Sequence, residues 1–252
     1  MPHPCAGNAG RYKQVWVKDK TTMTFREYVE SLMPDSMSLP EPLAVTFDWL
    51  QTNGHVEETA NKGEYYAALT PVGEDRFCTC FRPDPLYMEG WLSKEHRHLA
   101  KRVFVFAETG GEGSKAALWL DEQDKVQIVH IGSGSGSIWA GIMCGDSVDF
   151  LRLFAIGYEE ACWLESLPLT PVDAWLDSND YEDLEEAKEE EEEDYEGPAD
   201  PPATFAKFVS DTFGVTIPER GSEICKPPYS TLHDDNPTDP FARWLLTHQN
   251  EV

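Results

Sequence analysis

Hydrophobic residues recur with a helical period near the start of the chain and again in its last third. In residues 24–33 the apolar side chains stand at i, i+3, i+4 and i+7, which predicts a short amphipathic helix. Residues 203–213 carry a similar apolar stripe, at i, i+3, i+4 and i+8, which also predicts an amphipathic helix. Another helix is predicted to start at Asp239-Pro240, an N-cap residue followed by proline at the first helical position. We expect both C-terminal helices to dock on the main part of the protein.

The middle of the chain has the pattern of β-strands. Residues 65–69 and 76–81 are predicted to be two strands of a hairpin, joined through a turn at 71–73. A buried strand is expected in the run RVFVFA at 102–107, and the glycines at 110–113 end it.

A second hairpin is predicted directly afterwards. Strands at 116–120 and 125–131 flank four polar residues at 121–124, a connection typical of antiparallel strands. Both faces of the second strand are partly apolar, so we expect it to be central in its sheet.

A helix is expected after this sheet, with Asp146 or Ser147 as its N-cap and Gly157 at its end. The pattern continues as a second helical piece over 158–167, which stops before a proline. Together these segments predict an α+β fold.

Composition divides the chain into three parts. Residues 1–175 are predicted to form the main domain, 176–202 an acidic linker or frayed helix, and 203–252 a helical C-terminal extension. Tyrosines at 181 and 195 punctuate the acidic run at 182–196, which slightly favours docking over pure solvation.

The net charge of −26 restricts the classes of partner. Residues 177–196 hold thirteen acids and one lysine, so this segment carries −12 and the remainder −14. Such a surface repels phosphate backbones, which argues against nucleic-acid binding, and it favours association with a basic protein. Acidity alone is most often a matter of solubility.

Cytoplasmic location is expected from two observations. No window approaches the ~18 consecutive apolar residues of a membrane span, and residues 1–14 lack the apolar stretch of a secretory signal. The six cysteines show no framework spacing and are expected to be free thiols; they stand at positions 5, 78, 80, 144, 162 and 225.

Three patterns could carry chemistry, and each fails on detail. The Gly-Ser loop at 132–137 lacks the spacing of a dinucleotide fingerprint, of a Walker loop and of a nucleophile elbow. Cys78-Thr-Cys80 with His96-Arg-His98 lacks the spacing of a zinc site. Cys144, before a helix N-terminus, has no histidine nearby in sequence. We therefore predict no catalytic residue, metal or cofactor.

The segment around these patterns resembles a known family. FAETGGEG followed by SKAALWLDEQDKV, and SIWAGIM followed by DSVDFLRLFAIGY, are similar in order to the core of the SUKH superfamily, also called the Smi/Knr-like or cell-wall-assembly-regulator family. The resemblance covers residues 60–167, and 24–56 more loosely. It implies a mixed or antiparallel sheet flanked by helices. Bacterial members are mostly immunity proteins that bind and neutralise a polymorphic toxin, often a nuclease or deaminase.

The resemblance thus implies a non-enzymatic immunity protein with a cognate toxin, expected to be basic, as its partner. The contacts are predicted to be exposed acids in the two turns of the sheet: Glu112, Asp121, Glu122 and Asp124. A regulatory scaffold of the Smi/Knr-like type is the alternative. An enzyme that holds a phosphorylated ligand in the Gly-Ser loop is a third hypothesis. The oligomeric state stays open.

Overall fold

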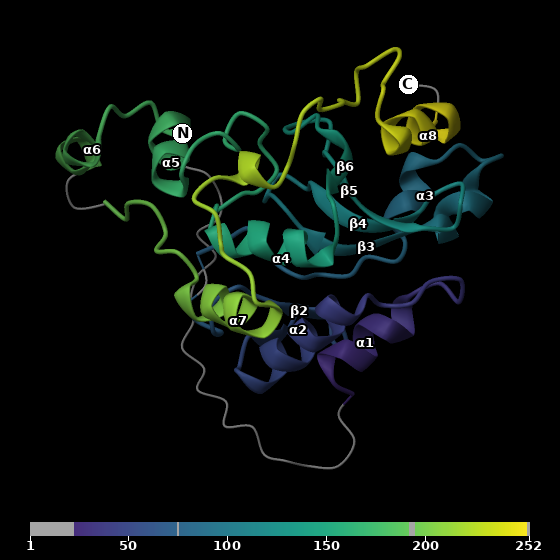
Figure 1. Cartoon of the computed structure of the whole chain (residues 1–252), viewed down its shortest axis with the longest axis horizontal. Helices are drawn as coiled ribbons and strands as arrows, with labels where there is room; N and C mark the ends of the chain where they lie inside the picture. The colour runs from purple at the N-terminus through teal and green to yellow at the C-terminus, as the bar shows by residue number, and fades with distance from the viewer. Residues whose placement is uncertain (1–22, 75, 192–194, 251–252) are drawn as a thin grey trace.

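A computed structural model describes residues 23–74, 76–191 and 195–250 of the chain. It contains a four-stranded antiparallel sheet, a two-stranded sheet and flanking helices (Figure 1). This confirms the predicted α+β fold class. The predictions for Cys5, for the N-terminal leader and for the acids at 192–194 lie outside the described residues.

The main sheet is a simple meander in which every neighbouring pair is antiparallel and the order is β3-β4-β5-β6. The predicted hairpin is confirmed as β4 and β5, which pair from Lys115↔Ile131 to Leu120↔Val126. The predicted central position of β5 is confirmed too. The four strands are β3 (Val103–Glu108), β4 (Lys115–Leu120), β5 (Val126–Ile131) and β6 (Ala140–Cys144).

Alternation along the strands divides the interior into two hydrophobic cores, one on each face of the main sheet. Phe106, Leu118 and Ile128 face the larger core, whereas Trp119 and Val129 face the smaller one. Both central strands therefore carry apolar side chains on both faces, which explains their nearly continuous hydrophobic pattern.

The larger core is closed by four helices. Phe81 is its aromatic centre, with ring centroids 5.3 Å from Phe47, 5.3 Å from Phe154 and 6.2 Å from Phe205. These rings come from residues more than a hundred positions apart, so the C-terminal region completes the core. The helices are α1 (Phe25–Leu32), α2 (Glu41–Thr52), α4 (Ser147–Ile156) and α7 (Ala203–Phe213).

The helix termini follow their local sequence. Thr24 and Glu27 form a capping box at the start of α1. The Asp146 carboxylate caps α4, and Gly157 ends this helix with a left-handed φ of 93°. The helices predicted at 24–33, after Asp146 and at 203–213 are thus confirmed.

The smaller core lies on the opposite face of the sheet, where α8 (Pro240–His248) packs (Figure 1). The Phe241 ring lies 5.3 Å from that of Trp119. Asp239 caps α8 as predicted. The short helix α3 (Tyr87–Trp91) and the 3-10 helix η1 (Arg97–Arg102) complete this layer.

Segments outside the sheet cover both of its edges. Beside β6, the Ala140 N–H donates to Ser230 O at 3.0 Å, and the Ile142 N–H donates to the Asp239 carboxylate at 2.9 Å. Beside β3, the Asp84 N–H donates to Val105 O at 3.1 Å. These backbone N–H and C=O groups on the edges of the sheet are therefore hydrogen-bonded within the chain.

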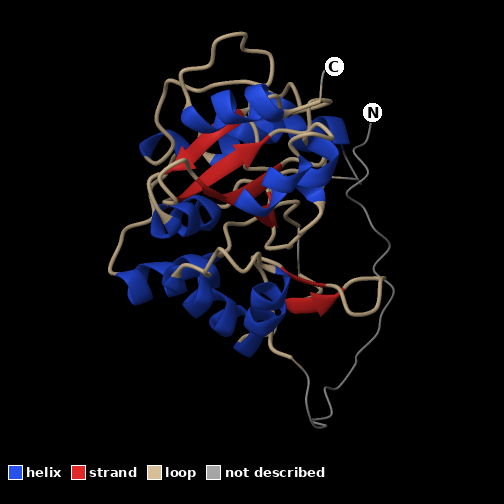
Figure 2. Cartoon of the chain, turned by 90° about the vertical axis from the view of Figure 1, so that its right-hand side faces the viewer, coloured by secondary structure: helices blue, strands red, loops and turns tan. Residues whose placement is uncertain are grey.

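The hairpin predicted from 65–69 and 76–81 is reduced to a single antiparallel bridge, Ala67↔Phe81, with two backbone hydrogen bonds. β2 (Tyr65–Ala67) instead pairs with β1 (Val56–Glu58), in a small sheet set apart from the main one (Figure 2). Residues 76–81 form only isolated bridges, because the backbone N–H groups of Cys78 and Thr79 both donate to Glu159 O. This long-range contact limits the strand pairing that the local pattern suggested to the one bridge at Ala67.

The helix predicted over 158–167 is also wrong, since this segment consists of turns. Its polar groups bind other elements: the Ala161 N–H donates to Thr109 O at 2.7 Å, and the Tyr158 hydroxyl donates to Leu169 O at 2.6 Å. The apolar residues of this segment still pack into the core, although the segment forms no helix.

The acidic segment is partly folded. The Trp175 ring of α5 (Pro171–Ser178) lies 5.8 Å from Tyr181 and 6.4 Å from Tyr195, and the Lys188 ammonium is 5.6 Å from the Tyr195 ring. Between these tyrosines runs α6 (Leu184–Glu191). A 3-10 turn, η3 (Gly221–Glu223), follows α7. The division of the chain into domains stays a prediction.

Candidate functional site

The hairpin cleft is a hollow of about 600 Å³ between the β4–β5 turn and helix α8. One wall is the turn, which contributes Asp121, Glu122 and Gln123. The other wall is the exposed side of α8. The remaining lining residues are Trp119, Gln127, Ile142, Pro240, Arg243, Trp244, Thr247 and His248.

Asp121 organises the turn. One carboxylate oxygen accepts hydrogen bonds from the backbone N–H groups of Gln123 and Lys125, both at 2.9 Å, and the other accepts from Gln127 Nε2 at 3.0 Å. The bond from Gln127, together with the two backbone bonds, lowers the pKa of this carboxyl. Asp121 is 8% exposed. The prediction that Asp121 is an exposed acid is wrong, because hydrogen bonds within the turn occupy both of its carboxylate oxygens.

The remaining acids of the turn point to solvent, and only one is unengaged. The Asp124 carboxylate pairs with the Arg102 guanidinium at 2.8 Å, and its own backbone has a positive φ of 57°. Glu122 is exposed and makes no hydrogen bond or ion pair with any residue in the described part of the chain. A partner could therefore pair with Glu122 without breaking any hydrogen bond or ion pair to the described residues of the protein.

Glu112 is half-buried and faces the protein. Its carboxylate accepts from the Ser114 N–H at 2.9 Å and from the Ser114 hydroxyl. Burial raises the pKa of Glu112, but hydrogen bonds from Ser114, Ser133 and Cys162 outweigh it, so the pKa is lowered. The prediction of an exposed acid at this position is wrong for the same reason as at Asp121.

The Gly-Ser loop closes over this carboxylate. A Cβ added at Gly136 would lie 2.9 Å from Glu112 Cγ, and one at Gly132 would lie 2.3 Å from Ser137 O. These glycines are therefore required by close packing of the loop on itself and on Glu112. The Glu112 carboxylate would repel a phosphate in the loop, which argues against the phosphate-ligand hypothesis.

The α8 wall carries a free cation above an apolar floor. Arg243 is exposed, and its guanidinium makes no hydrogen bond or ion pair with the residues that the structure describes. Below it, Trp119 is 1% exposed and Trp244 is 7% exposed. The Trp119 Nε1 hydrogen has no acceptor among the described residues.

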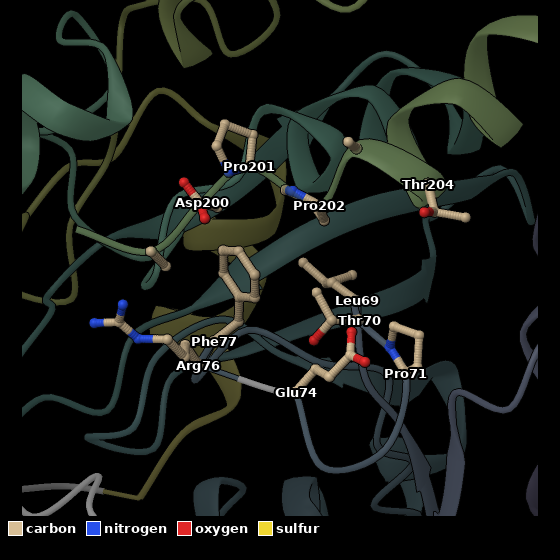
Figure 3. Close-up of a pocket in the computed structure, with 12 residues that line it drawn as sticks. Leu69, Thr70, Pro71, Glu74, Arg76, Phe77, Asp200, Pro201, Pro202 and Thr204 are labelled. Atoms are coloured by element: carbon tan, nitrogen blue, oxygen red, sulfur yellow. The ribbon is translucent and has the colours of Figure 1, made fainter. Parts of the chain in front are cut away.

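A second hollow, of about 300 Å³, lies between residues 69–77 and 199–204 (Figure 3). Arg76 turns away from it and donates to Glu196 O at 3.1 Å and Gly197 O at 2.8 Å. The Ala199 N–H donates to the Glu159 carboxylate at 2.8 Å. These bonds hold the end of the acidic segment against the body of the protein, so the hollow is a seam between two anchored segments.

Three buried residues that could carry chemistry, His130, Cys144 and Cys162, lie in surroundings that favour their neutral forms. His130 is fully buried, and its ring nitrogens contact Thr109 Oγ1 at 2.9 Å and Trp139 O at 3.0 Å. Burial lowers its pKa to about 4. Burial also raises the pKa of the Cys144 and Cys162 thiols, which disfavours their thiolates at neutral pH. Within the described ranges, no three His, Cys, Asp or Glu residues gather as metal ligands.

The structure brings only two of the predicted contact acids to one hollow, Asp121 and Glu122. Glu112 and Asp124 do not line it. Sequence reasoning missed Arg243, which faces the turn only because α8 docks more than a hundred residues away along the chain. Trp244 belongs to the helix that was predicted to start at Asp239-Pro240 and to dock on the main part of the protein, but it was not predicted to be part of a site.

None of the helices in the described ranges is long and apolar enough to cross a membrane. No family model, curated protein or solved structure matches this chain. The resemblance to the SUKH superfamily therefore stays a prediction that rests on the order of its sequence elements.

Proposed function

We propose that this chain is a non-enzymatic binding protein of the immunity type, which neutralises a basic cognate toxin through the β4–β5 turn. The observation that carries the proposal is Glu122. Its carboxylate is exposed and unengaged, on a turn whose neighbouring carboxylates are fixed by internal bonds.

Rigidity of the turn supports this role. The bonds to Asp121 and the ion pair of Asp124 hold the loop on two central strands, so binding orders few additional groups. The net charge of −26 accelerates encounter with a basic partner, whereas the close contacts decide its affinity.

The test is co-expression with the product of the gene immediately upstream, scored by rescue from lethality and by a pull-down. Rescue together with a stable complex supports immunity. If neither occurs, the immunity proposal fails and the regulatory-scaffold alternative gains weight.

A charge swap locates the interface. Glu122→Lys should lower the association rate by about tenfold at low salt, because a rim charge acts mainly on encounter. Glu185→Lys on α6 is the matched control, since it makes the same charge change at another exposed acid. Equal effects of the two variants would show that only total charge matters and would remove the turn from the interface.

A further inference from the structure

The hairpin cleft presents unpaired charges of opposite sign on its two walls. Glu122 stands on the turn, and Arg243 stands on α8. The third charged residue of the lining, Asp121, is already held by three hydrogen bonds within the turn. Asp121 keeps its negative charge, but Glu122 and Arg243 are the charged side chains of the cleft that a ligand can pair with without breaking a bond inside the protein.

The floor of the cleft supplies an apolar surface and an unsatisfied donor. Ile142, Pro240 and Trp244 provide the apolar contacts. The indole of Trp119 also lines the cleft, and its Nε1 hydrogen is buried without an acceptor among the described residues. A buried donor of this kind has lost its water without gaining a partner, which is unfavourable.

The two unsatisfied donors favour one kind of ligand group. A carboxylate accepts two parallel hydrogen bonds from a guanidinium and accepts equally well from an indole N–H. An ammonium group would pair with Glu122 alone, would be repelled by Arg243, and would leave Trp119 Nε1 without an acceptor. The volume of about 600 Å³ lies within the usual range for small-molecule sites.

We propose that the hairpin cleft binds a carboxylic acid with an apolar body. The carboxylate pairs with Arg243, and the body lies on Trp244 and Ile142. The far end, which faces Glu122, is neutral or cationic. This site goes beyond the proposed toxin binding and does not depend on it.

Trp119 gives the proposal a spectroscopic signature. Because Nε1 is covered, a bound carboxylate reaches it only when a neighbouring side chain shifts. Binding should therefore move the Trp119 indole N–H signal in a proton–nitrogen NMR spectrum of the full chain. Trp119→Phe assigns that signal by removing it.

The probe is phenylacetate, and phenylacetamide is its uncharged control. We expect phenylacetate to shift the indole signal in a saturable way, whereas the amide leaves it in place. Equal shifts with acid and amide, or no saturable shift with the acid, would overturn the proposal.

Variants on the exposed surface test the ion pair without risk to folding. Arg243→Gln should weaken phenylacetate binding by about fivefold or more, and Glu122→Gln should strengthen it by about twofold by removing a like charge. Arg220→Gln, at an exposed arginine away from the cleft, is the matched control and should bind as the parent does. If Arg243→Gln and Arg220→Gln bind alike, the carboxylate does not pair with Arg243 and the proposal is wrong.

A second pair of probes identifies the source of the carboxylate. An acetylated dipeptide ending in phenylalanine is compared as its free acid and as its amide. Tighter binding of the free-acid dipeptide than of phenylacetate assigns the site to a peptide chain end, and the reverse order assigns it to a small acid. Both outcomes support the carboxylate chemistry. Because this titration contains no toxin, its failure leaves the rescue experiment untouched, and failure of rescue leaves the titration untouched.

Discussion

The two faces of the main sheet are built from the same strands but covered differently. On one face, helices from both ends of the chain close an aromatic core around Phe81. On the other face, α8 and two short helices leave a hollow beside the β4–β5 turn. The more completely covered face maintains the fold, and the less covered face offers the surface on which binding is proposed.

Matched phenylalanine truncations measure this difference directly. Phe81 and Phe241 are both fully buried, but Phe81 contacts four aromatic rings and Phe241 contacts two. We expect Phe81→Ala to reduce the free energy of unfolding by about 4–5 kcal/mol and Phe241→Ala by about 3 kcal/mol. Urea denaturation of both variants provides the measurement. A larger loss for Phe241→Ala would reverse the assignment of the two faces.

Acid should destabilise the protein through the face that excludes water more fully. Burial lowers the pKa of His130 from 6.5 to about 4, and it lowers the pKa of His55 as well. Below pH 6.5 His130 is protonated in the unfolded chain, whereas in the folded chain it stays neutral down to about pH 4. Stability is therefore full above this pH and falls as the pH drops towards about 4, by about 3 kcal/mol for His130.

Thermal unfolding across this pH range checks the prediction. In His130→Gln the overall stability is lower, because the ring stacked on Trp139 at 4.3 Å is lost. The slope of stability against pH should nevertheless flatten between pH 6.5 and 4 relative to the parent. An unchanged slope would contradict a neutral, buried His130.

The turn beside the cleft should tolerate change less well at Asp121 than its loop position suggests. Asp121→Ala removes three hydrogen bonds, so we expect a loss of about 1–2 kcal/mol. Asp121→Asn keeps an acceptor oxygen and should recover part of that loss. Chemical denaturation separates the two variants, and equal losses would mean that the charge, not the bonding pattern, holds the turn.

The smallest effect is expected at Glu122, the neighbour of Asp121. Glu122→Gln should change the free energy of unfolding by no more than about 0.5 kcal/mol, because the side chain is exposed and unengaged. Melting curves run beside those of Asp121→Ala make the comparison. A loss as large as that of Asp121→Ala would reveal a structural role and would disqualify Glu122 as a free contact.

Local sequence predicted those elements whose determinants are local. The β4–β5 hairpin, the N-caps Asp146 and Asp239 and the stop at Gly157 all depend on neighbours within a few residues. The errors arose where residues distant in the sequence determine the backbone conformation. The Glu159 carbonyl, for example, accepts hydrogen bonds from the N–H groups of Cys78 and Thr79, so these residues do not form a regular strand.

The candidate site was predictable only in part, for the same physical reason. The sequence alone predicts that an acid in a polar turn is exposed. The carboxylates of Asp121 and Glu112 instead accept hydrogen bonds from nearby N–H and hydroxyl groups. The juxtaposition of Glu122 with Arg243 depends on how α8 docks, which no short-range pattern encodes.

The closed edges of the main sheet restrict how any partner can be recognised. Ser230, Asp239 and Asp84 already occupy backbone groups that an incoming strand would need. A partner that extended this sheet, or a second copy of the chain that paired with it, would first have to displace these segments. Recognition at this sheet instead uses side-chain chemistry, so that surface substitutions can change its specificity while the scaffold stays constant.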